Sequence, residues 1–148
     1  MRSTLRAGMV PVLASMLLAL GWSGSATAEP RGKTSFKDDV FPILQYRCGE
    51  CHKAGGEGME QSGLNLETYE GLMQGTRFGP VVIPGDSVAS NLNVLVEGRA
   101  VVREEVMVDG KKVVRERKGN RMPHNKRPLT PCEIDVLKSW VNQGAKNN

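Results

Sequence analysis

The residues with the clearest chemistry lie together in Cys48-Gly49-Glu50-Cys51-His52. This C-x-x-C-H spacing is the attachment pattern for c-type haem. Two thiols about one helical turn apart can add to the two vinyl groups of the porphyrin, and the histidine beside the second thiol then lies where it can ligate iron. Gly49 eases the tight backbone course between the thiols because it has no Cβ. The spacing predicts one covalently attached haem c, bound through Cys48 and Cys51, with His52 as an iron ligand.

Other chemistries of the same cluster stay open but are less favoured. A zinc site would add Cys132 or His124 to the cluster. Structural zinc ligands usually come as two separated pairs, however, and the adjacent Cys51 and His52 would strain to reach one tetrahedral ion. A thioredoxin-like redox pair needs a surrounding βαβ pattern, which the sequence does not offer. A cluster of reduced structural cysteines fits poorly with the export signal at the N-terminus.

Haem iron needs a sixth ligand or an open site, and this choice separates two classes of function. A methionine ligand raises the reduction potential and gives an electron-transfer protein, whereas an open site allows chemistry on a small molecule. Met122 is the preferred ligand because it lies in an irregular loop where Pro123 restricts the backbone. If Met122 is not a ligand, its side chain fills a gap in the packing. His124 is the rival ligand. The other methionines after residue 28 are predicted in different settings: Met59 in a Gly/Glu-rich loop, Met73 in a short amphipathic helix and Met107 in a strand.

The N-terminus has the pattern of a secretory signal peptide. Arg2 and Arg6 precede an uncharged apolar stretch at 7–22, and Ala26-Thr27-Ala28 matches the small-x-small cleavage pattern. The stretch has 16 residues, fewer than the roughly 18 of a membrane-spanning helix, so retention as an anchor is the less favoured alternative. We expect residues 1–28 to be a signal peptide and residues 29–148 to be an exported, periplasmic domain without a stable membrane span.

Cys132 has no role in this scheme. An odd cysteine in an exported chain can be a reactive surface thiol or can form a disulfide-linked dimer, and a position at the start of a helix favours its thiolate. A buried small residue is the preferred interpretation.

Composition and local patterns predict short elements separated by loops. A length of 148 residues allows one domain, and 17 glycines and 8 prolines against 5% aromatic residues leave few large side chains to fill a core. A capping pattern at Ser35 predicts a helix leading toward Cys48, which Pro42 must kink or restart. The other predicted elements are a helix at 68–73, a helix capped by Asp86 and running to Leu92, a β-hairpin at about 100–118 with Asp109-Gly110 as its type I′ turn, and a helix at 131–143 with Thr130 and Glu133 as its capping box.

Further residues between Phe36 and Ala145 form a recognisable pattern around the haem motif. They are Pro42-Ile43-Leu44 before it and Leu64-x-Leu66, Pro84-Gly85, Met122-Pro123, Leu129-Thr130-Pro131, Ile134, Trp140 and Gly144-Ala145 after it. With C-x-x-C-H, this pattern resembles class I c-type cytochromes, most closely those of the planctomycete type. The resemblance implies a mainly α, cytochrome c-like helical domain wrapped around covalent haem, with His52 and Met122 as axial ligands and a function in electron transfer. Cys132 and the charged insertion between about Gly98 and Gly119 depart from the usual spacing of that family.

Charge divides the chain into two parts. Residues 99–127 hold ten Lys and Arg against four Asp and Glu, a net charge of +6, whereas the rest of residues 29–148 carries −4. If Met122 ligates iron, the basic segment lies near the haem edge and would steer an acidic redox partner toward it; otherwise the hairpin is a solvated surface ribbon. The acidic remainder and export argue against nucleic-acid binding.

Taken together, these features favour an exported electron-transfer protein rather than an enzyme. It would act alone or as a subunit of a larger oxidoreductase. The alternative is a haem enzyme or gas sensor whose sixth ligand position is open or whose ligand is readily displaced.

Overall fold

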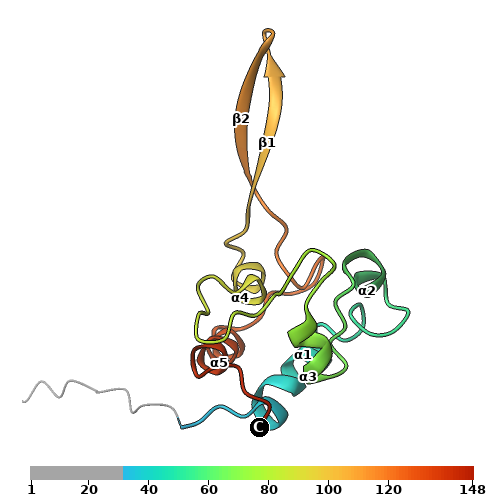
Figure 1. The fold of residues 1–148 in the computed structure, drawn as a ribbon, viewed down its shortest axis with the longest axis vertical. Helices are drawn as coiled ribbons and strands as arrows, with labels where there is room; N and C mark the ends of the chain where they lie inside the picture. Colours follow the sequence, from blue (N-terminus) through green and yellow to red (C-terminus); the bar gives the residue numbers. More distant parts are fainter. Residues whose placement is uncertain (1–31) are drawn as a thin grey trace, which may run out of the picture. The chain divides into compact units, whose positions relative to one another are not determined.

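The computed structural model describes residues 32–148, so the predicted signal peptide at 1–28 lies outside the described residues. Figure 1 shows a group of short helices from which one β-hairpin extends. Within the described range, no helix has the length and apolar character that a membrane span requires. In chain order the elements are a π-helical turn η1 (Phe36–Val40), α1 (Phe41–Arg47), α2 (Glu57–Ser62), α3 (Tyr69–Gln74), α4 (Asn91–Val96), β1 (Val101–Val108), β2 (Lys111–Lys118) and α5 (Pro131–Asn142).

The prediction of a mainly α domain is wrong. Helices make up only 36% of the described residues and a two-stranded antiparallel sheet accompanies them, so the fold is small and mixed α/β. Two helices are short because glycines with positive φ end them: Gly63 (φ 79°) follows α2 and Gly75 (φ 77°) follows α3. Asp86 does not begin a helix as predicted. Its Oδ1 instead accepts hydrogen bonds from the N–H groups of Val88 and Ala89, both 2.9 Å, in a turn that precedes α4.

Local signals set the ends of the first and last helical segments as predicted. Ser35 caps η1, because its hydroxyl accepts a hydrogen bond from the N–H of Asp38 (3.1 Å). Pro42 lies in the first turn of α1, where a missing N–H costs no hydrogen bond, and the chain changes there from π- to α-helical geometry. Thr130 and Glu133 form the capping box of α5, with both reciprocal hydrogen bonds present.

The first and last helical segments pack against each other, and this contact is largely aromatic. The ring centroids of Phe36 in η1 and Trp140 in α5 lie 5.4 Å apart, and Tyr69 of α3 contacts Phe36 edge-on at 5.1 Å. These rings lie beside a core of mostly aliphatic residues. The buried core comprises Phe36, Val40, Leu44, Leu64, Leu66, Leu72, Val81, Val82, Leu92, Val96, Leu129, Leu137, Trp140, Val141 and Ala145.

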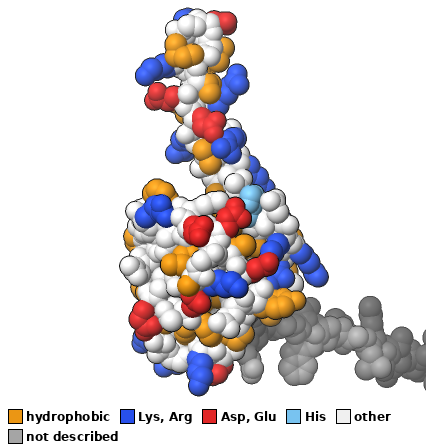
Figure 2. Space-filling model, turned by 90° about the vertical axis from the view of Figure 1, so that its right-hand side faces the viewer, with side chains coloured by type: hydrophobic (Ala, Val, Ile, Leu, Met, Phe, Trp, Pro, Cys, Tyr) orange, Lys and Arg blue, Asp and Glu red, His pale blue; other side chains and the backbone are white. Residues whose placement is uncertain are grey.

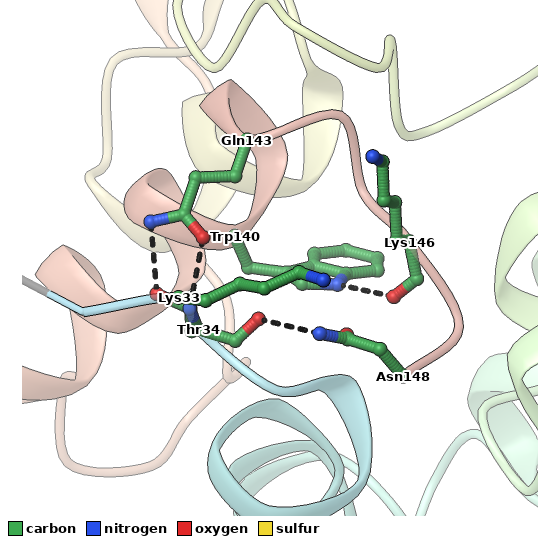
Figure 3. A pocket seen from close by; sticks show the side chains of 6 residues that line it. All are labelled: Lys33, Thr34, Trp140, Gln143, Lys146 and Asn148. Carbon is green, nitrogen blue, oxygen red and sulfur yellow. Dashed lines mark hydrogen bonds between the residues drawn. The ribbon is translucent and has the colours of Figure 1, made fainter.

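The C-terminal residues fold back over Trp140 and bond to the segment before η1 (Figure 3). The indole Nε1–H donates to the carbonyl of Lys146 (2.9 Å), and the side chain of Gln143 accepts a hydrogen bond from the N–H of Thr34 (2.8 Å). The amide of Asn148 donates to the carbonyl of Thr34 at 3.4 Å. These bonds border a shallow pocket, and they hold α5 against the first helical segment.

The predicted β-hairpin is confirmed. β1 and β2 pair antiparallel in one register along their full length. Asp109 and Gly110 have φ values of 49° and 74°, as a type I′ turn requires. At the base, the N–H of Gly119 bonds to the carbonyl of Ala100 (2.8 Å), so the chain returns to the helices where it left them. Every residue of β2 is exposed, and the hairpin extends away from the core (Figure 1).

Candidate functional site

The C-x-x-C-H motif follows directly on α1 and forms a tight turn. Cys48 is the C-cap residue of this helix, and its carbonyl accepts hydrogen bonds from the N–H groups of Cys51 and His52, 3.1 Å each. A Cβ at Gly49 would lie 2.6 Å from the carbonyl oxygen of Gln45, so this turn requires glycine there. The turn leaves Cys48 half-buried against the core and Cys51 exposed.

The ring of His52 is held by the backbone of the segment that follows α2. Its Nδ1 lies 3.3 Å from the carbonyl oxygen of Leu64, and its own carbonyl accepts a hydrogen bond from the N–H of Leu66 (2.8 Å). When Nδ1 carries the proton and donates to a carbonyl, Nε2 keeps its lone pair for a metal, which is typical of ligating histidines. A Cβ at Gly58 would lie 3.0 Å from Nε2, so glycine keeps that ring edge clear. The Leu64-x-Leu66 segment thus orients His52 for ligation.

The chemistry around the two thiols differs from that of a redox pair or a zinc site. Burial raises the pKa of the Cys48 thiol to about 11, although the nearby cations of Arg47 and Lys126 partly lower it. A thioredoxin-like pair needs a lowered thiol pKa and a βαβ unit, whereas the only strands among residues 32–148 are those of the hairpin. The same range contains no group of three His, Cys, Asp or Glu side chains that could hold a metal ion. Both alternatives are therefore disfavoured.

Two contacts join the C-x-x-C-H turn to residues 119–129, which we call the Met122 loop. Arg47, the last residue of α1, donates from Nη2 to the carbonyls of Arg127 (2.6 Å) and Pro128 (2.7 Å). Glu50, inside the motif, forms an ion pair with Lys126 of the loop. The hydrogen bond from the Lys126 ammonium holds the pKa of the Glu50 carboxyl below its ordinary value. The structure thus brings the loop that carries Met122 next to the predicted haem attachment turn.

Sequence reasoning did not identify Arg47 or Glu50 as site residues. Their partners lie 80 and 76 residues further along the chain. The sequence signals only that a basic residue precedes the motif and an acidic residue lies within it. Neither signal identifies the partner residue. The partners of Arg47 in particular are backbone carbonyls, which any residue would supply.

The candidates for the sixth ligand occupy distinct environments. Met122 is half-buried against the core that also contacts Cys48, and its N–H bonds to the carbonyl of Leu95 in α4 (3.1 Å). This bond fixes the backbone of the loop at Met122. The other candidates lie elsewhere: Met73 on α3 against the core, Met59 on α2 rather than in the predicted loop, Met107 on the hairpin with 64% of its surface exposed, and His124 exposed in the Met122 loop.

Cys132 is exposed in the first turn of α5, so the preferred interpretation of a buried residue is wrong. The buried stripe of α5 runs through Leu137, Trp140 and Val141. At 100° per residue, position 132 falls outside this stripe, about 140°, 80° and 180° from its three residues. Its thiol forms no disulfide with the other described cysteines.

Residues 48–107 match the sequence profile of the family described as Planctomycete cytochrome C. This segment is similar to planctomycete-type cytochrome c. The match begins at Cys48, includes Cys51 and His52, and ends within β1, before Met122 is reached. Neither a curated protein nor a solved structure matches the chain. The resemblance to this family is confirmed over the matched range, and it suggests a haem-binding protein of the c-type.

The residues of the C-x-x-C-H turn fit covalent haem c. Two thiols on one turn and an imidazole whose Nδ1 lies against a backbone carbonyl are the donors that this group requires. When bound, haem c supplies an iron that gains and loses one electron. The role of the chain is to fix the turn that carries the thiols, to orient the imidazole through Leu64 and to keep the ring edge clear at Gly58.

Proposed function

We propose that this protein is an exported monohaem c-type cytochrome that transfers electrons, with His52 and Met122 as the axial ligands of its iron. The observation that carries the proposal is the attachment of the Met122 loop to the C-x-x-C-H turn. Arg47 bonds two carbonyls of that loop, and Glu50 pairs with Lys126. Both proposed ligands therefore belong to backbone segments that are tied together.

This attachment suits electron transfer because little has to move when the iron changes charge. The imidazole of His52 is oriented by the carbonyl of Leu64, and the backbone of Met122 is anchored to Leu95. A thioether is a soft neutral ligand that favours the reduced iron and raises the reduction potential. The chain then binds no substrate; it holds two ligands at fixed positions while electrons pass at an exposed edge.

Replacing the proposed ligand tests this function. We expect Met122→Ala to abolish the weak far-red thioether-to-iron band of the ferric protein, to lower the reduction potential and to allow rapid carbon monoxide binding after reduction. Met107→Ala and His124→Ala are the controls, since both side chains are exposed, and they should change none of these properties.

The outcomes separate the proposal from its alternative. A wild-type protein that lacks the far-red band and binds carbon monoxide at once would be a haem enzyme or gas sensor. An unchanged reduction potential in Met122→Ala would contradict the ligand assignment. A haem stain on the denatured, exported protein tests the attachment itself, because a thioether-linked haem survives denaturation whereas a ligated metal does not.

We further propose that the redox partner has an acidic docking surface. Of the ten cations in residues 99–127, Arg99 and Lys126 are paired with Glu97 and Glu50. Three more are paired within the hairpin, namely Arg103, Lys112 and Arg117. β2 alone has a net charge of +4, and its side chains are exposed. Electron exchange with anionic ferricyanide should therefore slow as salt rises, whereas exchange with cationic hexaammineruthenium should not slow. Rates that are independent of salt for both probes would exclude electrostatic steering by this segment.

A further inference from the structure

The hairpin leaves two strand edges unpaired. β1 and β2 form a two-stranded sheet, which no other strand among residues 32–148 joins. An isolated hairpin is marginally stable in water, and an open edge is a template for further pairing. Figure 2 shows apolar and charged side chains interspersed along this projecting arm. Its exposed large apolar residues are Val101, Met107, Val113 and Val114.

The register of the hairpin fixes which backbone groups face the open edge of β1. In a two-residue turn, the flanking pair of Val108 and Lys111 exchanges hydrogen bonds, and bonded and non-bonded pairs alternate from there. The even-numbered residues of β1 therefore bond to β2. The odd-numbered residues from Val101 to Met107 direct their N–H and C=O groups outward.

We propose that β1 pairs antiparallel with β1 of a second copy of this chain, giving a four-stranded sheet in the order β2-β1-β1-β2. Outward groups meet only if odd-numbered residues face odd-numbered ones. In the central register, Arg103 lies opposite Glu105 of the second copy, and the two-fold symmetry of the dimer repeats this pair. Within its own hairpin Arg103 pairs with Glu116 (2.7 Å) and Glu105 with Lys112 (3.5 Å), so the contact between copies extends these exposed ion pairs into a network. Shifting the register in either direction by the next allowed step places Arg103 opposite Arg103, or Glu105 opposite Glu105. Charge complementarity therefore selects one register.

The same register also matches the apolar residues of β1. Val101 faces Met107 of the second copy, so two residues exposed in the single chain gain cross-strand partners. On the other face of the sheet, the half-buried Val102 faces Val106. Glu104 meets Glu104 on the symmetry axis. Each of these carboxylates is already paired with the Arg117 guanidinium of its own hairpin at 2.7 Å, which offsets their repulsion.

The charges of the two strands explain why β1, and not β2, forms this contact. β1 has a net charge of −1 with both signs present, whereas β2 has a net charge of +4. Two β2 edges would repel each other. The proposed dimer leaves both β2 edges outside, where they stay available to an acidic redox partner. The inference depends on the hairpin alone and not on the ligation of the iron.

The test uses two single charge reversals that are rescued by mixing. We expect the holoprotein without its leader to dimerise in sedimentation velocity over a concentration series. Arg103→Glu and Glu105→Arg should each weaken the dimer by roughly tenfold or more, because each places two like-charged pairs at the interface. An equimolar mixture of the two variants should restore dimers, since every carboxylate at positions 103 and 105 then faces a guanidinium.

Controls and contrary outcomes are equally specific. Lys118→Glu makes the same change of charge as Arg103→Glu, but on the outer edge of the sheet, and it should leave the dimer intact. Arg103→Glu also removes the ion pair with Glu116, whereas no ion pair of Lys118 is present among the described residues, so the rescue by mixing is the decisive control. A loss of hairpin structure would weaken each variant, but mixing would not restore dimers, and that result would overturn the proposal. A wild-type protein that is monomeric at every concentration, or single variants that dimerise like the wild type, would overturn it as well.

The register has its own test. In a Cys132→Ser background, Glu104→Cys should form a disulfide-linked dimer under mild oxidation. Residues at this position face each other in a non-bonded pair, with Cα atoms about 4.5 Å apart, within the range of a disulfide. Glu105→Cys should not cross-link efficiently, because it faces Arg103. Equal cross-linking of both variants would contradict this register.

Discussion

The side chain of Arg47 connects α1 to the Met122 loop, and its removal should both destabilise the protein and loosen the proposed sixth ligand. Nη2 donates two hydrogen bonds, of 2.6 and 2.7 Å, to backbone carbonyls, and the side chain is only 15% exposed. A hydrogen bond to a charged group contributes about 1.5–3 kcal/mol. We take the lower value for each, because one nitrogen makes both bonds, which gives about 3 kcal/mol for Arg47→Ala. The carboxylate of Glu133, 3.6 Å from Nε, lies beyond hydrogen-bond distance and adds little.

This loss is measurable in two independent ways. For a domain of this size, about 3 kcal/mol corresponds to a decrease of roughly 10 °C in the midpoint of thermal unfolding. In the ferric protein, the far-red thioether band should weaken, because the Met122 loop is no longer tied to the end of α1, directly before the predicted haem attachment turn. Arg127→Ala is the matched control. It removes the same charge and leaves the carbonyl that Arg47 bonds.

The conservative variant tests the geometry of this contact. Arg47→Lys keeps the charge but presents a single ammonium in place of the planar fork, so its stability should fall between that of the wild type and that of Arg47→Ala. If Arg47→Ala unfolds within about 0.5 kcal/mol of the wild type and keeps its far-red band, the loop is held by other contacts. If Arg127→Ala destabilises the protein equally, net charge and not the two hydrogen bonds is responsible.

Two further predictions concern the elements on either side of this contact. Burial alone would raise the pKa of Glu133, but hydrogen bonds from Thr130 and the nearby Arg47 outweigh it and lower that pKa below 4.5. The stabilisation from Glu133 is therefore present above about pH 4.5 and disappears as the pH falls through the lower folded-state pKa. The midpoint of thermal unfolding of Glu133→Gln should differ from that of the wild type at pH 7 and converge with it in acid. A difference that stays constant with pH would contradict this linkage. Gly58→Ala should reduce the ratio of covalent haem to protein, because the added Cβ would lie 2.9 Å from Cε1 of His52, whereas Gly32→Ala, with no atom within 4 Å of its added Cβ, should not.

Features encoded by neighbouring residues were predictable from the sequence. The Thr130–Glu133 capping box, the Asp109-Gly110 turn and the paired strands each depend on residues close together in the chain, and the structure confirms them. The resemblance to the family was predictable for the same reason, since C-x-x-C-H needs only five adjacent positions. These signals act within one element, and tertiary packing did not override them.

Features that depend on packing or on distant backbone groups were not predictable in this way. The mainly α class failed because glycines end α2 and α3 early and the hairpin adds strand in place of helix. Asp86 has the chemistry of a helix cap, but it serves a turn instead. The contact of Arg47 with carbonyls 80 residues away has no sequence signature at all. The exposure of Cys132 could have been predicted, because it falls outside the periodic apolar stripe of α5.

The contacts at the base of the hairpin indicate that it is an insertion that leaves the helical part of the structure intact. Gly119 bonds to Ala100 (2.8 Å), and the N–H of Met122 bonds to Leu95 (3.1 Å), so the chain is anchored on both sides of the hairpin. Replacing residues 101–118 by Asn-Gly, a favoured two-residue turn, should therefore preserve the far-red band and the reduction potential. The same variant should lose both dimerisation and the salt dependence of electron exchange, since β1 and β2 supply those properties. Loss of the far-red band in this variant would show instead that the hairpin itself positions Met122, and that the extended spacing between the haem motif and Met122 serves ligation.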